Sequence, residues 1–288
     1  MSRKLRRRRS VLYVPASNPK AMAKVASLAC DAVIFDLEDA VAPNAKAEAR
    51  ANLVAHFRGG GRSPVQERVI RINLSGGGLD RDDLAAVEAC RPDALLIPKV
   101  ETAEVLRDAR QALQGRGCGG VRLWAMIETP AGLVRLRDIV ECGAAEDVGL
   151  DCLVAGTNDI SKETGVPLPG GRKTIEHWLA MITIHGHAFG LDSLDGVYND
   201  FRDEEGFAQE CRNSALSGFA GKTLIHPGQI APANAAFSPS PEAVAEARAI
   251  VAAFEDPANA GKGVISINGK MTELLHAEIA RKILAKAG

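Results

Sequence analysis

Aromatic residues are scarce in this sequence, at 4% of 288 residues, so Ala, Val, Leu and Ile must supply most of any core. Long apolar runs are missing as well. The longest, such as residues 94–98 and 153–156, are far shorter than the ~20 residues that a membrane-spanning helix requires. No apolar segment follows the basic N-terminus, so we expect neither a secretory signal nor a membrane protein.

Paired cysteine motifs are also absent. The six cysteines are scattered without a CxxC pair (Cys30, Cys90, Cys118, Cys142, Cys152 and Cys211). This scatter argues against a zinc site or a disulfide framework, and it fits reduced thiols in the cytoplasm. No GxGxxG follows the first expected strand, and no GxxxxGK[ST] occurs anywhere, so the two common nucleotide-binding loops are excluded.

Charge is balanced overall, with a formal net charge of −1, but it is unevenly distributed. Residues 1–9 hold six bases and no acid, which leaves 29 bases and 36 acids, a net charge of −7, in the rest of the chain. An acidic body is unsuited to binding a phosphate backbone, so we expect no nucleic-acid partner. We predict a solvated, disordered tail for residues 1–9, with a targeting or nucleic-acid-binding tail as the alternative.

Short β-branched runs alternate with longer helical patterns along most of the chain. The expected strands are 11–15, 32–38, 68–73, 94–99, 122–128, 152–156, 191–196 and 221–226, and the expected helices are 19–30, 46–57, 81–90, 102–113, 131–142, 172–189 and 204–216. Eight such units predict a (β/α)8 barrel, with a doubly wound open sheet as the alternative.

The pattern changes after residue 237, where Ser-Pro-Ser-Pro interrupts the chain. A helix is expected over 242–254, a Gly-rich stretch over 259–269, and a last helix over about 272–286. The sequence therefore predicts three parts: a tail at 1–9, a barrel at 10–237, and a helical C-terminal extension at 238–288 that covers the mouth of its own barrel or a neighbour's.

Polar side chains follow nearly every expected strand, at the barrel face where active sites lie. Glu128 and Asp159 end consecutive strands, which are roughly 4.8 Å apart in a parallel sheet. Adjacent carboxylates repel each other unless they share a proton or a cation, and two carboxylates completed by water and substrate are typical of Mg²⁺. The alternative is that both residues cap or pair with the following helices.

Arg71 is expected at the same rim, where a guanidinium can bind a substrate carboxylate in bidentate fashion. Its alternative is an ion pair with the acids that follow the second strand. Those acids are Asp36, Glu38 and Asp39, and they can also orient the residues that bind metal or substrate. Lys99 and His226, which follow other strands, are further candidates for that role. Lys99 raises the alternative of a Schiff-base aldolase, and His226 that of a general acid or base.

Nine motifs in register resemble the citrate lyase β-subunit-like family, which includes malyl-CoA and citramalyl-CoA lyases. They are SVLYVP at 10–15, DLEDAV at 36–41 followed by Lys46 and Ala49-Arg50, RIN at 71–73, PKVE at 98–101, IET at 127–129, GTND at 156–159, GFAGK at 218–222, IHPGQI at 225–230 and FSPS at 237–240. The match extends from about Ser10 to the last helix.

The resemblance implies a Mg²⁺-dependent barrel that cleaves or forms a carbon–carbon bond between a 2-oxo acid and an acyl-CoA. It implies that Glu128 and Asp159 are metal ligands and that Arg71 holds the substrate carboxylate. It also implies a homotrimer or hexamer in which the C-terminal segment of one subunit closes the site of the next.

One departure from the family pattern concerns the start of the last helix. The family commonly has Gly-x-Met-Ile-Asp there, with the Asp in acid/base chemistry, whereas this chain reads GKMTE at 269–273. Glu273 is one methylene longer, and misplacing a reacting group by ~1 Å can cost roughly a hundredfold in rate. Its acid/base role is therefore a hypothesis. The alternatives are an aldolase for free hydroxy acids, an acyl-CoA thioesterase, and a non-catalytic acyl-CoA-binding or lyase-complex subunit.

Overall fold

The computed structural model describes residues 6–60, 63, 65–168, 172–267 and 269–287. The chain forms two compact units, Met1–Asn234 and Ala235–Gly288. Each unit is described by itself below.

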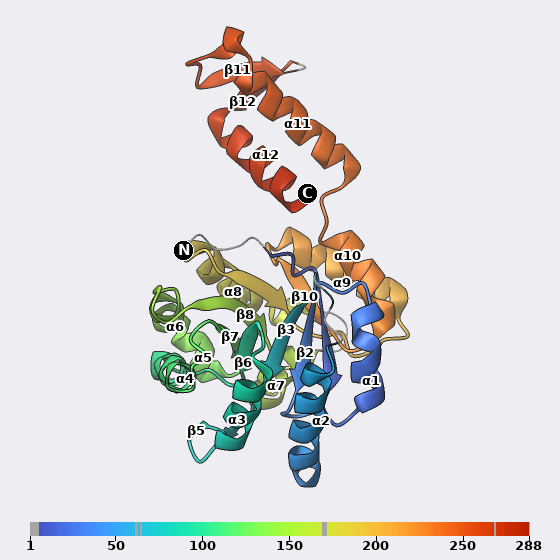
Figure 1. Cartoon of the computed structure of the whole chain (residues 1–288). Helices are drawn as coiled ribbons and strands as arrows, with labels where there is room; N and C mark the ends of the chain where they lie inside the picture. The colour runs from blue at the N-terminus through green and yellow to red at the C-terminus, as the bar shows by residue number, and fades with distance from the viewer. Residues whose placement is uncertain (1–5, 61–62, 64, 169–171, 268, 288) are drawn as a thin grey trace. The chain divides into compact units, whose positions relative to one another are not determined.

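The larger unit is a closed barrel of eight parallel strands (Figure 1). The strands are β1 (Ser10–Pro15), β2 (Ala32–Asp36), β3 (Glu67–Arg71), β6 (Ala94–Ile97), β7 (Arg122–Ile127), β8 (Leu150–Ala155), β9 (Asp192–Asp195) and β10 (Gly221–Leu224). They pair in chain order, and β1 closes the ring against β10. The predicted (β/α)8 barrel is therefore confirmed.

Inward-facing side chains alternate along these strands and fill the barrel with apolar atoms. Ile34, Leu96, Trp124 and Val154 are among the residues of this interior cluster, and Tyr13 packs against it. Several strands end one or two residues before the predicted position, because the polar residues that follow them already belong to the loops. Those loops hold Glu38, Lys99 and Glu128, whereas Asp36 and Arg71 are the last residues of β2 and β3.

Helices surround the barrel (Figure 1). They are α1 (Pro19–Lys24), α2 (Lys46–Arg58), α3 (Arg81–Cys90), α4 (Ala103–Gly115), α5 (Pro130–Val134), α6 (Leu136–Gly143), α7 (Thr157–Thr164), α8 (Glu176–Ala188), α9 (Glu204–Leu216) and α10 (Ile230–Ala236). Local capping explains several starts. Thr129, for example, accepts a hydrogen bond from Gly132 N at 3.0 Å, and Pro130 occupies the first turn of α5.

Three elements differ from the sequence prediction. The expected helix 131–142 is divided into α5 and α6 at Arg135. Helix α7 was not predicted, and it places Asp159 in a first helical turn rather than at a strand end. A small hairpin, β4 (Leu74–Ser75) and β5 (Gly78–Leu79), lies between β3 and α3, where the sequence predicted no element.

The N-terminal segment also differs from the expected disordered tail at Arg8 and Arg9. Arg8 is only 5% exposed, and its guanidinium pairs with Glu67 at 2.7 Å and with Asp192 at 2.7 Å. Arg9 pairs with Asp31 at 2.8 Å. These acids come from distant parts of the chain, so sequence composition alone could not reveal the pairing. Residues 1–5 lie outside the described residues.

The smaller unit contains α11 (Pro241–Glu255) and α12 (Leu274–Ala287), which pack against each other, and an antiparallel hairpin of β11 (Val264–Ile267) and β12 (Lys270–Glu273). The two predicted helices are present. The hairpin replaces most of the predicted Gly-rich stretch, and the last helix begins at Leu274 because Thr272 and Glu273 pair with β11.

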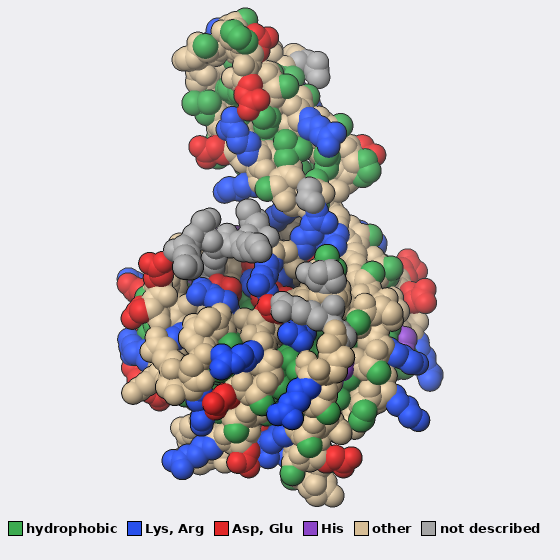
Figure 2. All heavy atoms as spheres, viewed as in Figure 1, with side chains coloured by type: hydrophobic (Ala, Val, Ile, Leu, Met, Phe, Trp, Pro, Cys, Tyr) green, Lys and Arg blue, Asp and Glu red, His purple; other side chains and the backbone are tan. Residues whose placement is uncertain are grey.

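On the visible face of the larger unit, basic side chains are interspersed with acidic ones (Figure 2). Within the part of the chain that the structure describes, no helix combines the length and apolar character needed to cross a bilayer.

Candidate active site

Glu128 and Asp159 occupy the neighbouring positions that the sequence predicted. Glu128 directly follows β7, and Asp159 lies four residues beyond β8, in the first turn of α7. The two strands are paired at Ile127 and Ala155. Glu128 is fully buried; its Oε1 accepts a hydrogen bond from Lys99 N at 2.8 Å, while its buried Oε2 has no hydrogen-bond partner.

The ionised form of Glu128 is destabilised by its surroundings when no metal is bound. Burial raises the pKa of this carboxyl to about 8; the Lys99 N–H lowers it, and the nearby Asp159 and Glu38 carboxylates raise it further. A cation beside Oε2 would supply the missing partner. Among the described residues no group of three or more His, Cys, Asp or Glu side chains could hold a metal. The predicted set is therefore limited to the two carboxylates of Glu128 and Asp159. That set fits Mg²⁺, which commonly keeps several waters.

Gly156 lets the Glu128 side chain pack directly against the backbone that follows β8. A Cβ at this position would lie 2.5 Å from Glu128 Oε2 and 2.4 Å from Glu128 Cβ. Only glycine therefore permits the observed position of the Glu128 carboxylate.

We expect Gly156→Ala to weaken Mn²⁺ or Mg²⁺ binding by at least about tenfold, since an added methyl group must displace the Glu128 carboxylate. Titration calorimetry of the metal measures this effect. Gly120→Ala is the matched control, because a Cβ there meets no atom within 4 Å. Unchanged metal affinity in Gly156→Ala would contradict the placement of the ion at Oε2.

Arg71 forms ion pairs with the acids that follow β2, which was the alternative to its role in binding a substrate carboxylate. Its Nε and Nη2 donate to the two oxygens of Asp36 at 2.7 and 2.6 Å, and its Nη1 lies 2.5 Å from Glu38 Oε2. Asp36 also accepts hydrogen bonds from the N–H groups of Glu38 and Ala40, so it fixes the loop after β2. Asp39, at 3.9 Å and 61% exposed, is peripheral.

Lys99 is held as a cation. It has a left-handed backbone conformation with φ of 48°, and its Nζ donates to Glu38 Oε1 at 2.8 Å. Burial lowers the pKa of this amine, but the hydrogen bond to Glu38 and the surrounding carboxylates raise it to about 12. A protonated amine is not a nucleophile, which disfavours the Schiff-base alternative.

His226 and Glu273, the two remaining predicted residues, are each described within their own unit. His226 is exposed, stacks on Phe201 with 4.9 Å between ring centroids, and accepts a hydrogen bond from Gly228 N through Nδ1. It caps the short helix Pro227–Gln229. Glu273 ends β12 in the smaller unit, where its N–H donates to His276 Nδ1 at 3.0 Å. Its acid/base role stays a prediction.

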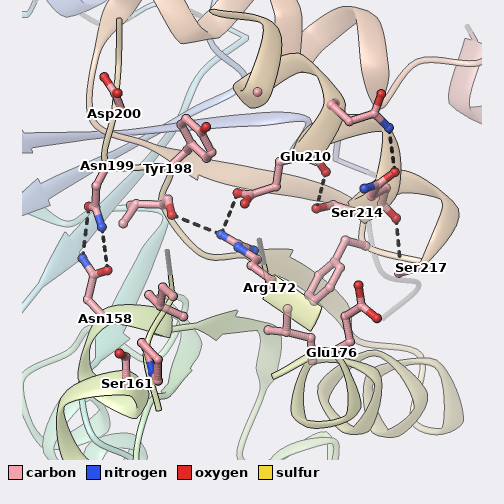
Figure 3. A pocket seen from close by; sticks show the side chains of 18 of the residues that line it. Asn158, Ser161, Arg172, Glu176, Tyr198, Asn199, Asp200, Glu210, Ser214 and Ser217 are labelled. Atoms are coloured by element: carbon pink, nitrogen blue, oxygen red, sulfur yellow. Dashed lines mark hydrogen bonds and ion pairs between the residues drawn. The ribbon is translucent and has the colours of Figure 1, made fainter. Parts of the chain in front are cut away.

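A cavity of about 910 Å³ lies beside α7, α8 and α9, and none of the predicted site residues lines it (Figure 3). Asn158, next to Asp159, exchanges two hydrogen bonds with Asn199 at its edge. Arg172 crosses its wall and donates to Glu210 at 2.8 Å.

Behind this cavity is a buried ionic cluster, defined as Arg172, Asp195, Glu210, Ser214 and Lys222. Lys222 and Asp195 are both 0% exposed, and Lys222 Nζ donates to Asp195, Glu210 and the Gly196 carbonyl at 2.7, 2.7 and 2.5 Å. Burial raises the pKa of Asp195, but Arg172 and Lys222 outweigh it and hold that pKa well below its usual range. The cluster joins the short helix Arg172–Thr174, β9, α9 and β10.

Sequence reasoning missed three residues of the barrel mouth: Tyr13, Met126 and Gly156. All three lie at or just beyond the ends of strands. Side chains alternate between the two faces of a strand, so counting back from the polar residues that end β1 and β7 could have identified Tyr13 and Met126 as inward-facing.

The closed parallel barrel, with polar residues gathered at and beyond the C-terminal ends of its strands, places the chain in the class of (β/α)8-barrel proteins, and the sequence comparisons name the family. The model of the HpcH/HpaI aldolase/citrate lyase family matches residues 9–227, and that of a carbon–carbon bond lyase of the TIM-barrel fold matches residues 172–288. The chain belongs to the HpcH/HpaI aldolase/citrate lyase family and is a carbon–carbon lyase by class.

Individual relatives cover nearly the whole chain. A (3S)-malyl-CoA thioesterase of Cereibacter sphaeroides is 43% identical over 97% of this chain and 94% of its own. The human mitochondrial citramalyl-CoA lyase is 34% identical over 93% of this chain and 82% of its own. The crystal structure of the protein CitE from Mycobacterium tuberculosis, in complex with magnesium, acetoacetate and coenzyme A, is 30% identical, with a TM-score of 0.75 and 97% of both chains covered.

Proposed function

We propose that this enzyme uses Mg²⁺ to cleave or form a 3-hydroxy-3-carboxyacyl-CoA such as malyl-, citramalyl- or citryl-CoA, with a 2-oxo acid and an acyl-CoA as the other partners. The observation that carries the proposal is the buried Glu128, whose Oε2 has no hydrogen-bond partner among the described residues and whose pKa is raised in part by the nearby Asp159 carboxylate. The magnesium in the related CitE complex supports the same metal.

Each of the predicted site residues has a separate role in this proposal. Glu128 and Asp159 would hold the metal, and Arg71 would bind the carboxylate of the substrate. When bound, Mg²⁺ would supply Lewis-acid chemistry to the substrate hydroxyl group that becomes the carbonyl group of the 2-oxo acid. Lys99 and Asp36 orient Glu128 and Arg71 through the hydrogen bonds described above. Glu273 is our candidate for the acid that protonates the acyl carbon, and it acts as the base in the reverse direction.

Thioester hydrolysis is the second candidate. It is favoured by the 42–43% identity to (3S)-malyl-CoA thioesterases, against 32–34% to the named lyases. Both reactions use a substrate with the same carboxylate and hydroxyl groups, so the site described above serves either. They differ in which bond breaks.

A mass-resolved product assay distinguishes the two candidates. Purified protein is given malyl-, citramalyl- and citryl-CoA, with Mg²⁺ and separately with EDTA. We expect Mg²⁺-dependent release of a 2-oxo acid together with the shortened acyl-CoA. Free CoA with an intact hydroxy acid identifies a thioesterase instead. Tight binding of the thioesters without any product would support a non-catalytic subunit and contradict both candidates.

A further inference from the structure

Two hydrogen-bond donors converge on one weak acceptor at the floor of the barrel mouth. Tyr13 Oη and Arg71 Nη1 each lie 3.9 Å from the thioether sulfur of Met126. The Arg71 guanidinium stands over the Tyr13 ring, 5.0 Å from its centroid. Tyr13 comes from β1, Arg71 from β3 and Met126 from β7, so the phenol reaches across the barrel interior.

The sulfur is a poor partner for either group. A thioether is only a weak acceptor, and both contacts are at the outer limit for sulfur. Among the described residues, the Met126 sulfur is the only hydrogen-bond partner of the Tyr13 hydroxyl. The other donor atoms of Arg71 are engaged by Asp36, and Nη1 also contacts Glu38. One phenol O–H and one guanidinium N–H therefore face the same point with no strong acceptor.

That point adjoins the proposed metal position. A Cβ on Gly156 would lie 2.5 Å from Glu128 Oε2 and 3.1 Å from Met126 Cε, so both side chains pack against the same point of the backbone and lie close together. Burial also raises the pKa of the Tyr13 phenol above its usual range, so it stays a neutral donor. A carboxylate bound by the two donors at the Met126 sulfur would therefore lie near the Glu128 carboxylate and the metal proposed beside it.

We propose that Tyr13 is a substrate-binding residue, and that its hydroxyl forms with Arg71 Nη1 a two-point site for the carboxylate of the 2-oxo acid. This inference rests on the proposed function and adds to it a second anchor for that carboxylate. The carboxylate replaces the Met126 sulfur as acceptor, and no bond other than these hydrogen bonds changes. Two donors from different strands fix the plane of the carboxylate, which a single Arg71 contact does not.

The test measures pyruvate binding at saturating Mg²⁺ by calorimetry, without CoA or turnover. We expect Tyr13→Phe to raise the Kd for pyruvate about tenfold, as the loss of one hydrogen bond to a charged group predicts, while Mn²⁺ affinity stays unchanged. Tyr198→Phe is the matched control. It removes the only other phenol in the chain, whose hydroxyl donates to Asp203 at the start of α9.

A second readout does not depend on the substitution. Incorporation of 3-fluorotyrosine gives two ¹⁹F resonances, assigned with the two Phe variants. We expect the Tyr13 resonance to shift when pyruvate is added with Mg²⁺, and the Tyr198 resonance to stay in place.

The outcomes separate the two proposals. Equal pyruvate affinity in wild type and Tyr13→Phe, or an unmoved Tyr13 resonance on pyruvate binding, overturns the role of Tyr13 and leaves the proposed function intact. A wild-type protein that binds none of pyruvate, glyoxylate and oxaloacetate even with Mg²⁺ overturns the proposed function together with this inference.

Discussion

Glu128→Gln is expected to reduce Mg²⁺-dependent turnover by more than about a hundredfold, since even partners of metal ligands are worth 10–100-fold. The amide keeps the size and the Lys99 hydrogen bond of the carboxylate but removes its charge. The same change should raise the Tm of the metal-free protein, because a buried negative group with an unpartnered oxygen and a nearby Asp159 is costly to fold. A variant that loses activity but gains stability in the absence of metal would indicate that the Glu128 carboxylate binds a cation.

Two measurements check this expectation: product formation as a function of Mg²⁺ concentration, and differential scanning calorimetry in EDTA. Glu163→Gln, an exposed carboxylate on α7, is the matched control and should alter neither quantity. A variant with wild-type Mg²⁺ dependence would remove Glu128 from the metal site. A lower Tm in EDTA would show that the carboxylate is satisfied without metal.

Lys222→Met is expected to lower the free energy of unfolding by about 3–5 kcal/mol, the usual effect of removing one partner of a buried ion pair. Lys222 has no exposed surface and donates to both carboxylates of the buried ionic cluster. Without it, Asp195 and Glu210 share Arg172 as their remaining cationic partner in that cluster. Met fills a similar volume, so the loss reports the charge rather than a cavity.

Urea denaturation followed by circular dichroism measures this loss, and Lys162→Met, on the exposed surface of α7, serves as the control. The double variant Lys222→Met with Glu210→Gln should recover part of the loss, because it also removes one of the two carboxylates that Lys222 served. Absence of any recovery would mean that Lys222 acts by packing and by its contact with the Gly196 carbonyl.

The barrel and the outline of its mouth were predictable because they depend on local pattern. Strand-to-helix alternation along the chain determines the architecture, and polar residues directly after apolar strands mark the active face. The neighbouring positions of Glu128 and Asp159 followed from the pairing of consecutive strands, even though α7 was not anticipated.

Features that depend on long-range contacts were not predictable. The basic N-terminal run looks like a solvated tail until its acidic partners are known, and these lie 59 and 184 residues from Arg8. The cluster around Lys222 likewise draws on four different elements. Tyr13 and Met126 read as core residues in the sequence, since alternation identifies an inward side chain but not its height within the barrel.

The ion pair between Arg8 and Asp192 has a consequence for the order of events when the polypeptide is made. Glu67 can pair with Arg8 once β3 has been made, but the pair with Asp192 joins residues 184 positions apart, and β1 gains its second neighbour only when β10 has been synthesised. Until then β1 and β9 are open edges of the sheet. Non-local pairing of this kind slows folding and leaves intermediates prone to association. The ring is therefore completed late, after the ribosome has released most of the chain.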